Sequence, residues 1–469
     1  SNNSADGAGR TITNGIDLAG EGGLVWVKSR TSAQDHSLTD TARGASVRLS
    51  ANTNAADATG SNYDRVDQFN SDGFRYPNGY AAAQDYVAWT FRKKEKFFDL
   101  VTWTGDGTTN RSISHSLGQI PGMIIAKKRS GTGDWHVLHR SVTMSGTGNS
   151  STGGLKLNAT GASTYYTHQW EHAYPEATLF KVAHVSGASA QTLNTDGETY
   201  IAYLFGHDTS SDGLIQCGSY TGNGSTTGPI VNLGFEPQWI MYRKVDDTGS
   251  WHIHDVIRGI PTGSNDGLLY ANRDYAENYT NDWLEVNSTG FQIKNTGSDA
   301  NTNNSTYIYV AIRKAPMATP TSRASVFAVT NETSATLNDS PPFKQVSNFP
   351  VDFVINKMVG AASSWWSASR ITNARLQLED SAAETSVGST HEFDHNDGVA
   401  VAGLYGASNF MGYIFRRAPK FFDIVTYGGN NTSGRTITHN LGVVPEMIWI
   451  KNRGYSAGED WAIYHKGLN

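Results

Sequence analysis

The chain repeats its own phrases, and this repetition constrains its fold more than any other feature. The phrase KFFDLVTWTG at 96–105 returns as KFFDIVTYGG at 420–429. Each copy is followed by a second shared phrase, SHSLGQIPGMIIAK at 114–127 and THNLGVVPEMIWIK at 438–451. A weaker copy, VNLGFEPQWIMYR, occupies 231–243. Repetition of this kind indicates that one small module recurs along the chain.

A proline inside the second phrase marks the register of the modules. The prolines are Pro121, Pro237, Pro350 and Pro445, so the spacings are 237 − 121 = 116, 350 − 237 = 113 and 445 − 350 = 95 residues. The KFFD phrase itself recurs after 423 − 99 = 324 residues, about three modules. We therefore predict about five modules, named repeats 1 to 5, at 1–94, 95–212, 213–319, 320–418 and 419–469.

The first and last repeats are incomplete. This indicates either a piece of a longer polypeptide or two ends that complete each other.

The repeats read as β structure. Each full repeat closes on an aromatic and β-branched run bounded by turn residues, at 86–92, 200–205, 307–313 and 411–416. No stretch carries convincing helical periodicity. We predict an all-β fold, a tandem array of β-sandwich modules of the jelly-roll or lectin-like kind. A propeller and a β-helix remain as alternatives.

Composition narrows the possible functions. Only 17% of the residues are charged, the formal net charge is −6, and no basic run exists, which argues against nucleic-acid binding. No apolar run is long enough to span a bilayer, so no membrane insertion is predicted. Neither a nucleophile elbow nor a phosphate-binding loop is present in the sequence.

Several phrases resemble a repeat found in tail-fibre and appendage proteins of phages, especially marine ones. The resemblance is carried by 219–224, 232–244, 251–259 and 307–313, and it is weakest over 320–418. It implies a virion-associated or extracellular protein with concanavalin-like lectin modules. It supplies no catalytic residues.

Tryptophans are the strongest binding candidates, because an aromatic face can stack on a sugar ring. Trp135, Trp251 and Trp461 recur at equivalent places, which predicts a structural role. Four others do not recur, and we predict ligand binding for them, with core packing as the alternative: Trp170, Trp283, Trp365 and Trp366.

Histidines and turn residues predict no cofactor and no metal site. His115 and His439 each precede a Leu-Gly turn, where a polar side chain commonly bonds the loop backbone. Two histidine pairs lack nearby carboxylates or cysteines, and two Asp/Asn-Gly clusters fit turns better than calcium loops. These are His168 with His172, His252 with His254, 194–197 and 394–398.

Paired acids could make the protein a polysaccharide depolymerase, since glycoside cleavage needs two carboxyl groups. The candidates near tryptophans are Glu171, Glu176, Glu277, Asp282 and Glu285. Nothing in the sequence distinguishes them from solvated loop acids, so we predict no enzyme.

The main hypothesis is a structural and adhesive virion protein that self-associates, contacts other virion proteins and binds surface glycans. A purely architectural collar or cement protein, a depolymerase and a secreted bacterial adhesin are the alternatives.

Overall fold

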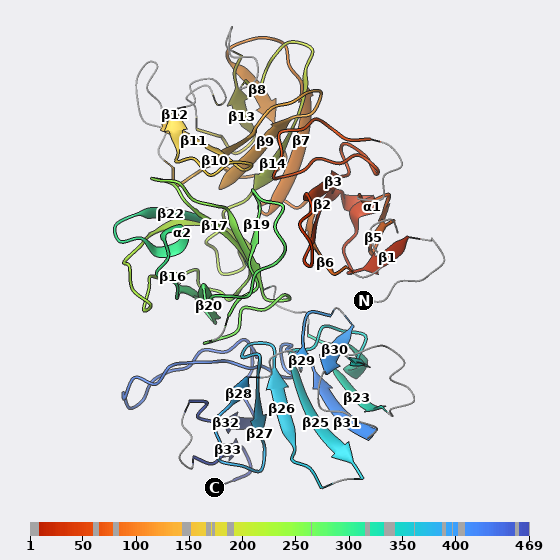
Figure 1. The fold of residues 1–469 in the computed structure, drawn as a ribbon, viewed down its shortest axis with the longest axis vertical. Helices are drawn as coiled ribbons and strands as arrows, with labels where there is room; N and C mark the ends of the chain where they lie inside the picture. Colours follow the sequence, from red (N-terminus) through yellow and green to blue (C-terminus); the bar gives the residue numbers. More distant parts are fainter. Residues whose placement is uncertain are drawn as a thin grey trace. The chain divides into compact units, whose positions relative to one another are not determined.

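The computed structural model describes residues 9–59, 65–77, 84–142, 152–165, 170, 174–184, 192–263, 265–314, 319–332, 343–360, 362–386, 391–395, 397–401, 409–454 and 459–468. It is 40% strand and 3% helix, which confirms the all-β prediction (Figure 1). The chain forms two compact units. Unit 1 comprises Ser1–His254, Gly267–Tyr279 and Gln292–Arg313; unit 2 comprises Asp255–Asp266, Thr280–Phe291 and Lys314–Asn469. The boundary between the units therefore runs through repeat 3.

Repeats 1 and 2 each contribute a larger and a smaller antiparallel sheet, as in a β-sandwich. In repeat 1 both sheets have three strands, β3-β2-β6 and β1-β5-β4, and the first is the larger because β2 and β6 have seven residues each. These strands are β1 (Arg10–Thr13), β2 (Gly23–Ser29), β3 (Ser37–Asp40), β4 (Gln68–Asn70), β5 (Gly73–Tyr76) and β6 (Tyr86–Arg92), with the short helix α1 (Leu18–Glu21).

In repeat 2 the orders are β12-β11-β10-β9-β14-β7 and β13-β8. The strands are β7 (Phe98–Thr104), β8 (Arg111–Ser114), β9 (Met123–Lys128), β10 (Trp135–His139), β11 (Thr152–Lys156), β12 (Thr164–Tyr165), β13 (Leu179–Val182) and β14 (Thr199–Phe205).

Repeat 3 has the sheets β15-β22-β17-β18-β19 and β16-β21-β20. Its elements are β15 (Ile215–Thr221), β16 (Ile230–Asn232), β17 (Pro237–Lys244), β18 (His252–Asp255), β19 (Leu269–Tyr270), β20 (Leu284–Asn287), β21 (Gly290–Ile293), α2 (Ser298–Asn301) and β22 (Thr306–Arg313).

Repeats 4 and 5 lie in unit 2, with the sheets β23-β31-β25-β26-β27-β28, β24-β30-β29 and β32-β33. A 3₁₀ turn, η1, covers Arg323–Ser325. The strands are β23 (Phe327–Glu332), β24 (Phe343–Val346), β25 (Phe353–Val359), β26 (Trp366–Ser369), β27 (Ala374–Gln377), β28 (Thr385–Ser386), β29 (His391–Glu392), β30 (Gly398–Val401), β31 (Asn409–Phe415), β32 (Met447–Ile450) and β33 (Ala462–His465).

Strand register confirms that the closing runs are equivalent. Each predicted run forms a strand, respectively β6, β14, β22 and β31. The last three pair with the strand of the proline phrase, and β6 pairs with β2, which holds the corresponding place in repeat 1 without a proline. Lys28 lies opposite Val87, Lys127 opposite Ile201 and Arg243 opposite Ile308. In every case the partner is the residue after the first aromatic of the closing run. Lys28, Lys127 and Arg243 therefore occupy the same position in three repeats.

The repeated KFFD phrase folds alike in both copies. Lys96 and Lys420 have φ values of 62° and 63°, and their backbone N–H groups donate to the carbonyls of Leu117 and Leu441, both at 2.8 Å. The glycines of the two Leu-Gly turns also match, with φ of 70° at Gly118 and 71° at Gly442. Glycine adopts this left-handed backbone without a steric penalty, which explains why both Leu-Gly turns carry it.

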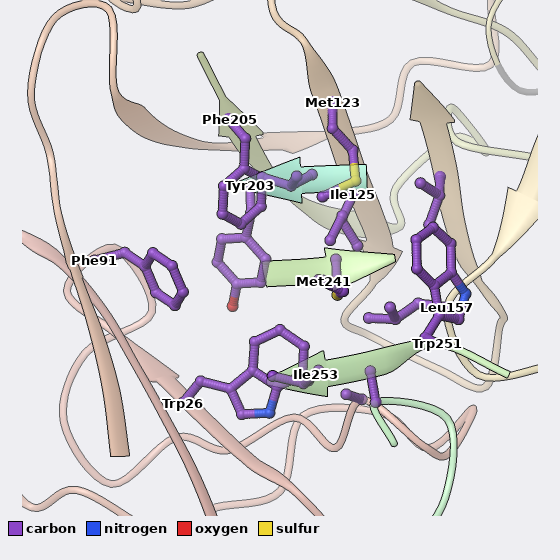
Figure 2. Close-up of a cluster of buried hydrophobic side chains, with 14 of the residues drawn as sticks. Trp26, Phe91, Met123, Ile125, Leu157, Tyr203, Phe205, Met241, Trp251 and Ile253 are labelled. Atoms are coloured by element: carbon purple, nitrogen blue, oxygen red, sulfur yellow. The ribbon is translucent and has the colours of Figure 1, made fainter. Parts of the chain in front are cut away.

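A single apolar core joins the three repeats of unit 1. The larger sheets of repeats 1, 2 and 3 each direct the buried side chains of one face to a common cluster, part of which Figure 2 shows. It includes Trp26 and Phe91 from repeat 1, Ile125 and Tyr203 from repeat 2, and Met241, Trp251 and Ile253 from repeat 3. Phe91 makes edge contacts with Phe205 at 5.6 Å and with Trp239 at 5.7 Å between ring centroids. Burial in unit 1 is thus shared between repeats as well as contained within them.

Polar contacts between the repeats of unit 1 close into a cycle. At the 1–2 junction Arg129 Nε lies 2.9 Å from Asp57 Oδ2, and at the 3–1 junction Arg30 Nε lies 2.6 Å from Glu277 Oε2. At the 2–3 junction Arg243 donates to loop carbonyls of repeat 2. Each repeat thus places its strand end against a loop of the preceding repeat. This head-to-tail contact closes after three repeats, as in a heterologous ring.

Candidate functional site

The recurring tryptophans are structural, as predicted. Trp135 and Trp251 are fully buried, and their indole N–H groups donate to the carbonyls of Ser50 at 2.8 Å and Lys156 at 2.9 Å. In both cases the acceptor belongs to the preceding repeat. Trp461 does the same in unit 2, donating to Gln377 at 3.0 Å. The side chain therefore links each repeat to the one before it.

Two of the four predicted binding tryptophans are buried. Trp170 is 3% exposed and contacts Phe180 edge-on at 6.2 Å. Trp283 is 9% exposed, and its backbone N–H donates to Asp266 Oδ2 at 2.7 Å. Core packing, the alternative weighed for these residues, accounts for both environments. The ligand-binding hypothesis therefore concentrates on the other two.

Trp365 and Trp366 lie on the large sheet of repeat 4. Trp366 is opposite Asn356 in the pairing of β25 with β26, just as Trp135 is opposite Lys127. It is thus the recurring tryptophan of its repeat, an equivalence that the sequence phrases conceal. Its ring lies 4.3 Å from the Arg375 guanidinium. Trp365 is the additional aromatic residue.

Trp365 forms an exposed aromatic platform with its neighbours on β25 and β31. Its side chain is 36% exposed and stacks on Tyr413, with ring centroids 6.2 Å apart. The ammonium of Lys357 lies 5.5 Å from the Trp365 ring. The backbone N–H of Trp365 donates to both carboxylate oxygens of Glu379 at 3.0 Å, which fixes the strand entry. We name Lys357, Trp365, Glu379 and Tyr413 the Trp365 platform.

The platform combines a flat apolar face with charged groups at its edge. Lys357 and Tyr413 share one face of the sheet, because Tyr413 pairs with Ile355 and side chains alternate with a period of two. An exposed ring flanked by a cation and a carboxylate offers stacking and hydrogen bonding together. This combination suits an amphipathic ligand such as a sugar.

The two histidines at Leu-Gly turns bond loop backbone, as predicted. His115 Nδ1 accepts from the backbone N–H of Leu117 at 3.2 Å, and His439 Nδ1 accepts from that of Leu441 at 3.2 Å. His252 and His254 are buried beside Tyr242, with ring centroids 4.8 and 5.8 Å from it. Within the described residues no group of three His, Cys, Asp or Glu side chains could hold a metal. His168 and His172 lie outside the described residues.

The candidate acids lie in different environments. Glu277 is bonded to Arg30, and Glu171 lies outside the described residues. Near Trp283, burial raises the pKa of Asp266 well above its usual value, and Asp282 and Glu285 add to the shift. Asp266 is fully buried, and its Oδ2 accepts from the N–H groups of Trp283 and Leu284. A carboxyl group held in this way braces the backbone and is closed to a polysaccharide.

Comparison with known proteins identifies a family but no characterised relative. No helix among the described residues is both long and apolar enough to cross a membrane. No curated protein and no solved structure shows significant similarity to the chain. A family described as "Domain of unknown function (DUF7483)" matches residues 3–316 and 414–469. The unmatched stretch corresponds closely to repeat 4, which carries the Trp365 platform. The chain belongs to the DUF7483 family.

Proposed function

We propose that the protein is a non-enzymatic structural and adhesive component of a virion appendage, such as a tail fibre or a capsid-attached fibre, and that it binds host-surface glycans. The observation that carries the adhesive part is the exposed Trp365 ring, with Tyr413 stacked beside it and Lys357 at its edge. The three-repeat core supports the structural part, because shared burial and cyclic contacts make unit 1 a rigid spacer. The virion assignment rests on the resemblance of the repeat phrases.

Truncation of the platform tests the adhesive role. Trp365→Ala is expected to weaken glycan binding about tenfold or more, because aromatic rings that become buried on binding contribute most of the binding energy at small interfaces. The measurement is binding of the full chain to a glycan array and to host cells. Tyr427→Ala is a matched control in the same unit. Tyr427 is 48% exposed and also carries a cation over its ring, Arg435 at 5.7 Å.

Three outcomes are informative. Loss of binding in Trp365→Ala alone supports the proposal. Absence of binding by the unaltered chain to every glycan and cell contradicts the adhesive role and favours the architectural alternative. Sugar release from a bound polysaccharide would instead favour the depolymerase.

We further propose that the chain self-associates through β32. This strand pairs with β33 in the register that β9 keeps with β10, Met447 opposite His465 and Met123 opposite His139. β32 belongs to a sheet of two strands among the described residues. Its side chains are exposed, including Met447 at 50% and Trp449 at 44%. The occupant we propose is β32 of a second copy, paired edge to edge.

Charge on this strand should prevent the pairing. Ile448→Lys is expected to shift the chain from dimer to monomer in sedimentation velocity at about 10 µM, because two lysines would face each other across the symmetric edge. Val346→Lys is the control, an exposed apolar strand residue of repeat 4 at 47% exposure. An unaltered chain that stays monomeric at ten times this concentration would sink the proposal.

A further inference from the structure

The three junctions between the repeats of unit 1 share the same backbone arrangement, but they differ in the hydrogen bonds that the Lys or Arg side chain makes across them. At the 1–2 junction Lys127 Nζ donates to the Asn54 carbonyl of the preceding repeat at 3.2 Å. At the 2–3 junction Arg243 Nη1 donates to the carbonyls of Lys156 at 2.9 Å and Ala159 at 3.1 Å. Both cations therefore fill the space between their own strand and the neighbouring loop.

The 3–1 junction departs from this pattern. Lys28 holds the equivalent position, and its Nζ donates to the Ser29 carbonyl at 2.8 Å just as Lys127 Nζ donates to the Lys128 carbonyl at 2.8 Å. Its second bond, however, goes to the Ser32 carbonyl of its own repeat at 3.5 Å, where Lys127 bonds the neighbouring loop. The loop of repeat 3 is nevertheless in place, because the Asp274 carbonyl accepts from the Gln34 backbone N–H at 2.9 Å. This bond matches the one from Gly133 to the Asn54 carbonyl at the 1–2 junction. The backbone contact is therefore the same at both junctions, whereas the second bond of the Lys28 ammonium stays within its own repeat.

A cavity of about 480 Å³ opens beside Lys28 at this junction. Its wall includes Lys28, Asp35, Ser37, Tyr76, Tyr86 and Asp274. Lys28 is 1% exposed and Ser37 is 3% exposed, so the inner wall is polar and shielded from solvent. The Ser37 hydroxyl is buried and has no hydrogen-bond partner among the described residues. Buried polar groups in proteins are nearly always bonded, so this hydroxyl indicates a missing partner.

The lining chemistry defines the class of ligand. Two cations, Lys28 and Arg48, and two carboxylates, Asp35 and Asp274, border the cavity, so its formal charge balances. The cavity therefore offers both donors and acceptors without an excess of charge, which suits a neutral occupant. The rings of Tyr76 and Tyr86, with centroids 5.8 Å apart, provide an apolar flank. The volume lies in the usual range for small-molecule sites, roughly 300–1,000 Å³.

We propose that the 3–1 junction cavity binds a neutral, polyhydroxylated ring of monosaccharide size. Such a ring presents hydroxyl groups that both donate and accept, and C–H faces that pack against aromatic rings. Lys28 would donate to a ligand hydroxyl, Asp35 and Asp274 would accept from others, and Ser37 would gain the partner it lacks. The site lies in unit 1 and does not depend on the Trp365 platform of unit 2.

Titration calorimetry with the full chain tests this directly. The probes are neutral hexoses, N-acetylhexosamines and the corresponding uronates. We expect at least one neutral sugar to bind with a Kd below about 1 mM. Ala33→Phe should abolish binding, because Ala33 borders the cavity and is itself exposed, so the larger ring blocks the site without removing a polar group. Asp274→Asn should weaken binding at least tenfold.

The controls separate this site from the platform and from general damage. Ala42→Phe places the same ring at an exposed position of repeat 1 that does not border the cavity, and it should leave binding unchanged. Trp365→Ala should also leave it unchanged. The proposal fails if no neutral sugar binds at millimolar concentration, which would mean that water fills the cavity. It also fails if Ala33→Phe binds as tightly as the unaltered chain, or if only uronates bind.

Discussion

Lowering the pH from 7 to 5 is expected to destabilise unit 1 by about 2 kcal/mol for each of His36 and His136. Burial, reinforced by Lys28 near His36 and by Lys156 and Lys127 near His136, lowers the pKa of each imidazole to about 3. The unfolded chain regains an ordinary pKa near 6.5 and takes up protons first. Stability that is fully present above pH 6.5 is therefore lost as the pH falls toward 3. His139 adds to the loss, because burial lowers its pKa to about 4.

The hydrogen bonds of His36 explain why its imidazole stays neutral in the folded protein. Its Nδ1 accepts from the Trp26 indole N–H at 2.8 Å, so this nitrogen must carry a lone pair. Its Nε2 lies 2.9 Å from the Tyr270 carbonyl and 3.1 Å from that of Arg273, and it must donate. One tautomer of the neutral ring satisfies all three contacts. A second proton would set two donors against each other and break the bond to Trp26.

The measurement is the free energy of unfolding between pH 7.5 and 4.5, with hydrogen-exchange mass spectrometry to follow unit 1 separately from unit 2. His36→Gln should reduce the pH dependence of the free energy of unfolding by about 1.4 kcal/mol per pH unit below pH 6. This effect is separate from any change in stability that the substitution causes at pH 7. His465→Gln removes an exposed histidine and should leave the slope unchanged. A slope that is the same in all three proteins would refute the assignment to His36.

Arg43→Met is expected to destabilise unit 1 by about 3–5 kcal/mol, because it leaves a buried carboxylate without its cation. The Arg43 side chain is fully buried, with Nε 2.5 Å from Asp40 Oδ2 and Nη1 3.1 Å from Asp57 Oδ1. Its Nη2 donates to the Leu38 carbonyl at 2.7 Å and to the Tyr203 hydroxyl at 3.0 Å. One guanidinium therefore joins repeat 1 to repeat 2, and its loss should loosen both.

Two comparisons sharpen the test of Arg43. Arg75→Met removes the same group from an ion pair with Asp67 in which the arginine side chain is 43% exposed. Its cost should be much smaller than that of Arg43→Met, as for surface pairs in general. In the double variant Asp40→Asn with Arg43→Met, part of the stability should return, since no unpaired charge is left buried. If Arg43→Met and Arg75→Met lowered the free energy of unfolding equally, burial of the Arg43–Asp40 pair would be unimportant.

Much of the fold could be predicted because its signal lies in local phrases. The closing runs formed strands almost to the residue, as in Tyr86–Arg92, since alternating aromatic and β-branched side chains encode a half-buried strand. The structural role of Trp135 and Trp251 followed from their recurrence alone. The division into two units did not, because it depends on which repeats pack together, and no single phrase carries that information.

The site was harder to predict for a similar reason. Trp365 and Trp366 were indistinguishable in sequence, and only the pairing of β25 with β26 separates the recurring residue from the additional one. Exposure of Trp365 and burial of Trp170 depend on tertiary packing, which overrides the chemistry of the residue type. No sequence feature predicted the junction cavity, because in sequence Lys28 is indistinguishable from Lys127 and Arg243, which occupy the same position in their repeats.

The cyclic contact between three repeats has an evolutionary consequence. In an open solenoid a repeat can be gained or lost singly, because each one needs only its neighbours. In unit 1 the removal of one repeat would leave one loop without its contacts to the next repeat, and it would expose one face of the common core to solvent. Duplications and deletions in such a lineage should therefore survive only in sets of three. The 324-residue offset between the two KFFD phrases, 423 − 99, would then be the unit of inheritance, and the hundred-residue repeat only the motif from which that unit is built.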